Sequence, residues 1–244
     1  MAKKIFKITV LTLFPDFVKD YAKFGILQRA IKQKLISINP LQLRDFALDE
    51  RGTVDDRPYG GGVGMVLKAD VLHKAIGKLK GKRKKEKEKQ RIILLTPQGK
   101  QFKQKDAQRL SKYDELVFVS GRYEGFDERV RSFVDEEISI GDYVLMGGEL
   151  PALVMSEAVL RLIPGVIGKL ESTDNESFSE NLLEYPQYTK PETLELRIRN
   201  KELSKKKILR VPKVLLTGHH KNVSEWSTSE AIKRTKKRRP DLLD

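Results

Sequence analysis

The sequence has 244 residues, with 48 Lys and Arg against 34 Asp and Glu, a net charge of +14, and no Cys. This length suits one large domain or two smaller ones, and an apolar content of 39% is enough for a buried core. The absence of Cys excludes a disulfide scaffold and any Cys-ligated zinc or iron–sulfur site. The apolar runs are too short or too charged to span a bilayer, and the N-terminal residues lack the features of a signal peptide. We therefore expect a soluble cytoplasmic protein with no membrane association.

The positive charge is concentrated in two regions of the chain. Residues 181–244 contain 16 Lys and Arg against 8 Asp and Glu, and residues 78–91 contain 9 against 2. The rest of the chain is close to neutral. This distribution indicates a polyanionic partner such as nucleic acid, with a solvated Lys-rich surface as the alternative.

The first part of the chain alternates strand-like and helix-like segments. Ile5–Phe14 is an apolar, β-branched run that ends at Pro15, which predicts a buried strand. Asp16–Gln33 has apolar residues at helical spacing, and Leu35–Phe46 alternates apolar and polar residues as a strand does. Ala69–Leu79 is predicted to be a helix.

The same alternation continues through the middle of the chain. Strands are predicted at Arg91–Leu95 and Leu116–Ser120, and helices follow at Lys103–Lys112 and Asp127–Val134. Ile138–Leu145 is again strand-like. Strands that alternate with helices favour an α/β fold, a parallel sheet with helices on both faces.

A long apolar helix is predicted at Glu149–Ile163, and Pro164-Gly165 ends it. Residues 168–180 are rich in Ser, Asn, Asp and Glu and have no apolar period. We predict that this stretch is a linker between a domain at residues 1–167 and a second domain at residues 181–244.

The second domain is expected to be small, basic and mostly helical. Pro191–Ser204 and Trp226–Lys237 are predicted to be short basic helices. In the first domain, Lys80–Gln90 is a run of charged residues that we interpret as a loop or a helix extension. Whether this basic insertion contacts RNA is left open.

Glycines cluster after the later strands and not after the first. No glycine-rich turn follows Phe14 and no GxxxxGK[ST] motif occurs, so neither a dinucleotide-binding fingerprint nor a P-loop is indicated. Glycine-bearing loops at residues 94–99, 120–125 and 140–151 each follow a strand, at the edge where open α/β sheets hold ligands. Glycines there let backbone groups approach a ligand closely, so the three loops predict a pocket formed mainly by main chain.

A fourth glycine cluster, DDRPYGGGVGM at residues 55–65, follows the second strand. Successive glycines lose much backbone entropy when they are ordered. Beside Arg57 and Tyr59 they suit a loop that closes over a planar or anionic ligand, and a flexible connector is the alternative.

The motifs together resemble one family. In chain order they are DDRPYGGG, LTPQG, GRYEG, IGDYVLMGGELP, RLIPGV, LLEYPQYTKPE and LTGHH. This ordered set resembles the bacterial tRNA (guanine-N1)-methyltransferases, which belong to the SPOUT class of knotted methyltransferases, and the resemblance extends from about Ile5 to Trp226. It implies a deep trefoil knot around the three loops, S-adenosyl-L-methionine bound in that knot, and a homodimer whose substrate site draws on both subunits. The implied reaction is methylation of N1 of the guanosine 3′-adjacent to the tRNA anticodon, at position 37.

The resemblance also implies a set of cofactor-binding residues within the three loops. They are Leu95, Thr96, Pro97, Gly121, Tyr123, Glu124, Ile140, Gly141, Asp142, Tyr143, Val144, Leu145, Gly147, Gly148 and Pro151. A magnesium requirement is implied as well, but no carboxylate cluster in the sequence locates it, and we predict no metal-ligating residues.

Methylation of guanine N1 makes two demands on the protein. N1 carries a proton at neutral pH, so a general base must remove it as the methyl group arrives. Negative charge then builds on O6, and a fixed cation stabilises it. By the resemblance, Glu176 is the base, where the family has Asp, with Asp174 as the alternative, and Arg161 is the cation. Glu184 matches an acidic position associated with cofactor or substrate across the dimer, or else faces solvent.

The basic C-terminal domain is expected to bind tRNA phosphates through Lys and Arg clusters at residues 205–213 and 233–239. His219-His220 lacks the partners of a metal site, and Trp226 is expected to anchor the small domain. The sequence leaves two other functions open: a non-catalytic RNA-binding protein on the same scaffold, and a SPOUT methyltransferase that acts on another RNA or on a ribose hydroxyl.

Overall fold

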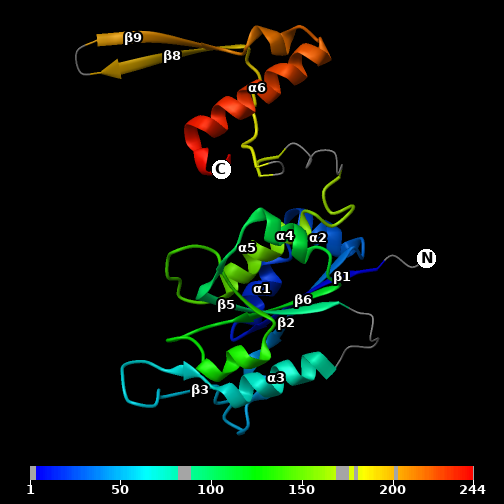
Figure 1. Ribbon diagram of the computed structural model, residues 1–244, viewed down its shortest axis with the longest axis vertical. Coiled ribbons are helices and arrows are strands. Elements are labelled where there is room, and N and C mark those ends of the chain that lie inside the picture. The colour runs from blue at the N-terminus through cyan, green and yellow to red at the C-terminus, as the bar shows by residue number, and fades with distance from the viewer. Residues whose placement is uncertain (1–3, 82–88, 169–175, 179–180, 201–202, 244) are drawn as a thin grey trace. The chain divides into compact units, whose positions relative to one another are not determined.

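The computed structural model describes residues 4–81, 89–168, 176–178, 181–200 and 203–243. The chain forms two compact units, Met1–Leu170 and Glu171–Asp244 (Figure 1). Most of the predicted linker, residues 168–180, and most of the basic run at Lys80–Gln90 lie outside the described residues. The domain boundaries therefore stay a prediction.

The first unit is built on a five-stranded, entirely parallel sheet with the strand order β2–β1–β6–β5–β7. The strands are β1 (Phe6–Thr12), β2 (Ile36–Gln42), β5 (Gln90–Gln101), β6 (Glu115–Ser120) and β7 (Glu136–Ser139). A separate short antiparallel pair is formed by β3 (Asp55–Asp56) and β4 (Val66–Leu67). The prediction of a parallel α/β sheet is confirmed.

Helices cover both faces of this sheet. They are α1 (Pro15–Tyr21), α2 (Gly25–Lys32), α3 (Ala69–Gly81), α4 (Gln104–Leu110) and α5 (Glu149–Leu160). Helices α1, α2, α4 and α5 share one buried core with Ile8 and Phe118, whereas α3 shares the other with Ile92 and Val119 (Figure 1). Because successive strand residues point to opposite faces, β1, β5 and β6 each contribute to both cores.

The ladder between β5 and β7 is irregular at the carboxyl edge of the sheet. Its register shifts between Leu95 and Lys100, and both of these residues pair with Ile138. The intervening residues 96–99 bulge out of the ladder, and a Cβ at Gly99 would lie 2.5 Å from the backbone N of Ile138. The backbones of β5 and β7 thus lie very close together at this irregularity.

Several predicted elements differ from the observed ones. Asp16–Gln33 forms two helices, because Gly25 adopts a left-handed φ of +59° that interrupts an α-helix. The segment predicted as a helix at Asp127–Val134 contains a 3₁₀ helix, Glu128–Phe133, whose only buried residue is Val130. The strand predicted at Ile138–Leu145 ends at Ser139, whose Oγ accepts a hydrogen bond from the N of Gly141 at 3.2 Å and turns the chain.

The second unit combines a hairpin with a helix. Strands β8 (Thr193–Asn200) and β9 (Leu203–Arg210) pair antiparallel, and α6 (His220–Arg238) follows. The prediction of a helix at Pro191–Ser204 is wrong. The sequence of β8 alternates apolar with polar or charged residues, which is the period of a strand and not of a helix. The unit is therefore not mostly helical.

The predicted helix at Trp226–Lys237 lies within α6. The Trp226 ring packs against those of Tyr185 and Tyr188, at centroid distances of 6.4 and 6.3 Å. The hydroxyl of the buried Thr235 accepts a hydrogen bond from the N of Leu183 at 2.9 Å. These contacts attach the segment before β8 to the helix. Within the described ranges, no helix is both long and apolar enough to cross a membrane.

Candidate functional site

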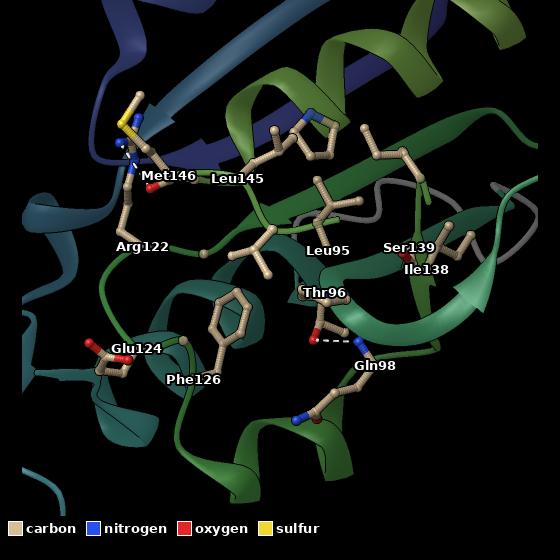
Figure 2. A pocket seen from close by; sticks show the side chains of 18 of the residues that line it. Leu95, Thr96, Gln98, Arg122, Glu124, Phe126, Ile138, Ser139, Leu145 and Met146 are labelled. Carbon is tan, nitrogen blue, oxygen red and sulfur yellow. Dashed lines mark hydrogen bonds between the residues drawn. The ribbon is translucent and has the colours of Figure 1, made fainter. Parts of the chain in front are cut away.

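Three loops meet at the carboxyl edge of the sheet and enclose a cavity of about 340 Å³ (Figure 2). Two of them follow β6 and β7, and the third is the bulge at residues 96–99 within β5, which lies between those two strands in the sheet. Because neighbouring parallel strands end at the same edge, their loops converge there. The volume falls in the range of roughly 300–1,000 Å³ that is typical of small-molecule sites.

The predicted cofactor residues gather around this cavity. All of them line it except Asp142, which is exposed and makes no part of the lining. Sequence reasoning missed several lining residues: Gln98, Arg122, Gly125, Phe126, Glu128, Arg131, Ile138, Ser139 and Met146. Most of these lie in or beside the same glycine-bearing loops, so a prediction that included every residue of each loop would have contained most of them. Glu128 and Arg131 come from the 3₁₀ helix and carried no such signal.

Glycines allow the three loops to pack against one another. A Cβ at Gly148 would lie 2.7 Å from both the N of Gly121 and the Cα of Ser120. The N of Gly148 donates to the carbonyl of Gly121 at 2.9 Å. Gly141 has a φ of +154°, and a Cβ there would lie 2.4 Å from the ring of Tyr143. The loops after β6 and β7 are therefore in backbone contact beside the cavity.

One non-glycine residue of the cavity has an unusual backbone conformation. Tyr123, in the loop after β6, adopts a φ of +59°. A left-handed conformation of this kind costs on the order of 1–3 kcal/mol in a non-glycine residue, and such residues cluster at functional sites. The backbone conformation of Tyr123 therefore lowers the stability of the fold, and such a cost is typical of a functional loop.

The cavity has both apolar and charged walls. Leu95, Ile138 and Leu145 contribute apolar surface, and Figure 2 shows Gln98 on another side. The guanidinium of Arg131 pairs with Glu128 at 2.8 Å and also contacts Glu137. Apolar side chains, charged groups and main-chain hydrogen-bonding groups together fit a ligand with a planar ring and an ionised end. The residues present thus fit S-adenosylmethionine, which combines a purine with an amino-acid group.

The predicted catalytic residues lie on different units. Arg161 is the C-cap of α5, its backbone N bonds to the carbonyl of Glu157 at 3.1 Å, and it does not line the cavity. Glu176 belongs to the second unit, and Asp174 lies outside the described residues. The Glu184 Oε1 accepts a hydrogen bond from Gln187 at 2.6 Å within the second unit.

No metal site is found in the part of the chain that the structure describes. No group of three or more His, Asp or Glu side chains there is arranged to hold an ion. The implied magnesium requirement therefore has no location on these residues.

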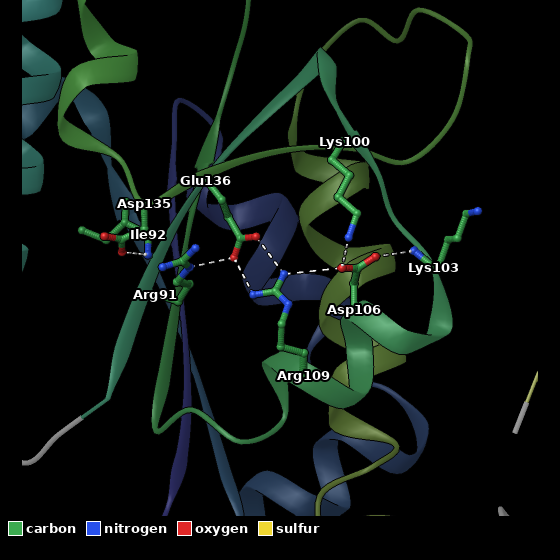
Figure 3. Close-up of polar contacts among 8 residues, drawn as sticks. All are labelled: Arg91, Ile92, Lys100, Lys103, Asp106, Arg109, Asp135 and Glu136. Carbon is green, nitrogen blue, oxygen red and sulfur yellow. Dashed lines mark hydrogen bonds and ion pairs between the residues drawn. The ribbon is translucent and has the colours of Figure 1, made fainter.

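A charged network ties β5, β7 and α4 together outside the cavity (Figure 3). The Glu136 carboxylate accepts hydrogen bonds from Arg91 at 2.8 Å and from both terminal nitrogens of Arg109 at 3.1 and 2.7 Å. Burial opposes ionisation of Glu136, but the hydrogen bonds from Arg109 and Arg91 outweigh it and lower the pKa of the carboxyl. Asp106 accepts a bond from Lys100 at 2.7 Å, and no side chain of this network lines the cavity.

The fold and the cavity define an α/β protein with a small-molecule site built from loops at the carboxyl edge of its sheet. Comparison with known proteins is more specific. The family model described as "tRNA (Guanine-1)-methyltransferase TrmD" matches residues 6–244, and the chain belongs to this family. The resemblance predicted from the motifs is confirmed.

Relatives named tRNA (guanine-N(1)-)-methyltransferase are similar over almost the whole chain. The protein from Desulfitobacterium hafniense (strain Y51) is 47% identical over 240 residues, which cover 97% of this chain and 84% of that relative. The one from Syntrophomonas wolfei subsp. wolfei is 48% identical over 237 residues, covering 97% and 90%. The one from Staphylococcus haemolyticus is 45% identical over 239 residues, covering 98% and 91%.

Proposed function

We propose that this protein transfers a methyl group from S-adenosylmethionine to N1 of the guanosine at position 37 of tRNA. One observation carries the proposal: in a member of this family, the loops that match the family's motifs enclose a single cavity at the carboxyl edge of the sheet. The names of the relatives support guanine N1 of tRNA as the acceptor. A tRNA substrate is in turn consistent with a cytoplasmic protein.

The methyl donor would bind in the cavity, where it supplies an electrophilic methyl group on a sulfonium. The predicted cofactor residues would hold it through main-chain groups and apolar side chains, and the exposed Asp142 stays part of this proposal. A trefoil knot through the loops is also proposed. The close backbone packing at Gly99 and Gly148 supports it, since chain crossings of this kind require small residues.

The chain's own residues would handle the acceptor. Glu176 would accept the proton from N1, and Arg161 would stabilise the charge that develops on O6. The two assignments are separate proposals, since Glu176 belongs to the second unit and Arg161 to the first.

A homodimer is supported by an apolar face on the first unit. Phe14, Phe17, Phe24, Leu150 and Val154 are between 46% and 72% exposed, and they lie on or beside α1 and α5. The two helices adjoin, since the Tyr21 hydroxyl on α1 donates to Glu157 on α5 at 2.7 Å. Exposed apolar patches mark interaction sites, and a second copy would cover this one. F17D and V154D should each convert the dimer to a monomer in analytical ultracentrifugation.

The second unit would bind tRNA phosphates. Lys206, Lys207 and Arg210 are exposed on β9, and the last turn of α6 carries Lys236, Lys237 and Arg238. Contacts of this kind give affinity that falls steeply with salt and little sequence information.

The proposal is tested by incubating the protein with labelled S-adenosylmethionine and unmodified tRNA transcripts that carry G or A at position 37. We expect label only in the G transcript, on N1 of that guanine. Label in the A transcript would indicate a methyltransferase of another target. Binding of tRNA without label in either transcript would indicate a non-catalytic RNA-binding protein.

Variants test the assigned roles. E176Q removes the base and R161A removes the cation, so each should abolish labelling while binding of S-adenosylmethionine stays within a few-fold of the wild type. E176D is the matched control, because it restores the family's residue and should stay active. Full activity of E176Q would exclude Glu176 and direct attention to Asp174.

A further inference from the structure

A buried carboxylate lies directly behind the cavity wall. Glu149, the first residue of α5, is 2% exposed, and its Oε1 accepts a hydrogen bond from the hydroxyl of the buried Thr12 at 2.6 Å. Its Oε2 accepts from Nε of Arg122 at 3.0 Å and pairs with Nη2 at 2.9 Å. A buried charge is costly unless it is paired and hydrogen-bonded, and here both carboxylate oxygens have partners.

Arg122 also holds the neighbouring loop. Its Nη1 donates to the carbonyl of Met146 at 3.2 Å, and its guanidinium carbon lies 4.4 Å from the ring centroid of Phe14. Figure 2 shows Arg122 beside Met146 at the edge of the cavity. A Cβ at Gly147 would lie 2.3 Å from Nε of Arg122 and 2.7 Å from Oε2 of Glu149. A methyl group at residue 147 would therefore displace the guanidinium or the carboxylate of this ion pair.

The loop needs such an anchor because its side chains are not packed. Val144 and Met146 are 85% and 92% exposed, and Tyr143 is 54% exposed. Apolar burial therefore cannot determine the shape of this wall of the cavity. Arg122 joins the loop after β6, the loop before α5 and the end of β1 at one point.

We infer that Arg122 and Glu149 are positioning residues that set the shape of the methyl-donor cavity. The inference rests on the proposed function, since it takes S-adenosylmethionine as the ligand. Arg122 acts through Glu149 and the Met146 carbonyl, and Gly147 provides the space that the guanidinium occupies. A lysine could neutralise Glu149 but could not make the forked bonds to Glu149 and Met146 together.

Titration calorimetry with S-adenosylmethionine on the full chain tests this inference. We expect R122A, R122K and G147A each to raise the Kd at least tenfold. The R122A/G147A double variant should bind little more weakly than either single variant, because both changes remove the same anchor.

R109A is the matched control. Arg109 makes an ion pair with Glu136 that is as close as that of Arg122, and its side chain is 38% exposed against 28% for Arg122. It does not line the cavity. R109A should lower the Tm and leave the Kd within twofold of the wild type, whereas a purely structural role of Arg122 would make the two variants alike.

The outcomes distinguish a failure of the proposed function from a failure of the inference about Arg122 and Glu149. If the wild type does not bind S-adenosylmethionine, the proposed function and this inference both fail. If the wild type binds and folded R122K and G147A bind equally well, only the inference fails. It fails also if R109A weakens binding as much as they do. Should R122A not fold, R122K and G147A decide the question.

Discussion

Gly148→Ala tests whether close backbone packing creates the cavity. Gly148 has φ −84° and ψ −3°, a conformation that alanine adopts freely, so the added methyl group acts only by its volume. Its Cβ would lie 2.7 Å from the backbone of Ser120 and Gly121, whereas ordinary contact begins at 3.4 Å. The loop after β6 must therefore withdraw from α5 by about 0.7 Å.

The expected cost follows from this displacement. Overpacking by a single methyl group typically costs about 1–3 kcal/mol, and contact with backbone places this site at the upper end. At roughly 2–4 °C for each kcal/mol, a cost of about 3 kcal/mol should lower the Tm of the first unit by about 6–12 °C. A shift of about 1 Å in a binding wall can cost about 100-fold in rate, so methyl transfer should fall further than stability does.

Gly77→Ala is the matched control for this change. Gly77 lies in the interior of α3, and a Cβ there meets no atom within 4 Å. The variant should be more stable than the wild type by about 0.8–1 kcal/mol, because alanine favours the helix. Calorimetric melting and titration with S-adenosylmethionine measure both variants. If G148A has the Tm and the Kd of the wild type, residue 148 does not pack closely against Ser120 and Gly121.

The remaining predictions concern charge and core packing. The pKa of Glu136 lies below its ordinary value, so its ionised form stabilises the fold above about pH 4.3 and this contribution is lost as the pH falls through the lowered pKa. E136Q should therefore unfold at lower urea than the wild type at pH 7, and the difference should shrink at pH 3.5; a difference independent of pH would contradict this. Phe118 is fully buried, and F118A should lose about 3–5 kcal/mol in urea unfolding; a loss below about 1 kcal/mol would show that the core can collapse around it. The hydrogen bond to Glu157 raises the pKa of Tyr21 to about 12, so E157Q should lower it toward 10 in difference ultraviolet titration, and unchanged titration would exclude the bond.

Local pattern was enough to predict the sheet and the place of the cavity. Buried strands such as β6 are continuous apolar runs, and strands that alternate with helices indicate parallel pairing. Since parallel strands end at one edge, loops carrying Gly121 and Gly141 could be expected to meet there. The predictions of S-adenosylmethionine as the ligand and of guanine as the methyl acceptor rested instead on the resemblance of the ordered motifs to a family.

Other features depend on tertiary contacts, which the local spacing of apolar residues does not indicate. The helix predicted at Pro191–Ser204 is instead β8, whose partner β9 pairs with it only in the folded unit. Arg122 and Glu149 are 27 residues apart in the chain and lie on opposite sides of a loop, so their pairing exists only in the fold. The 3₁₀ helix that carries Arg131 likewise reaches the cavity through tertiary packing.

Substitutions at the glycines of the cavity should therefore have larger effects than substitutions at its exposed side chains. Exposed lining residues such as Val144 contribute little packing of their own. Glycines that sit against backbone or against Arg122 instead determine how closely the loops approach. Because a methyl group added at Gly147 or Gly148 collides at once, gaining an atom there should disturb the site more than losing a side chain at Val144. Glycines and one buried ion pair therefore fix the shape of the cavity, and its exposed side chains follow that shape.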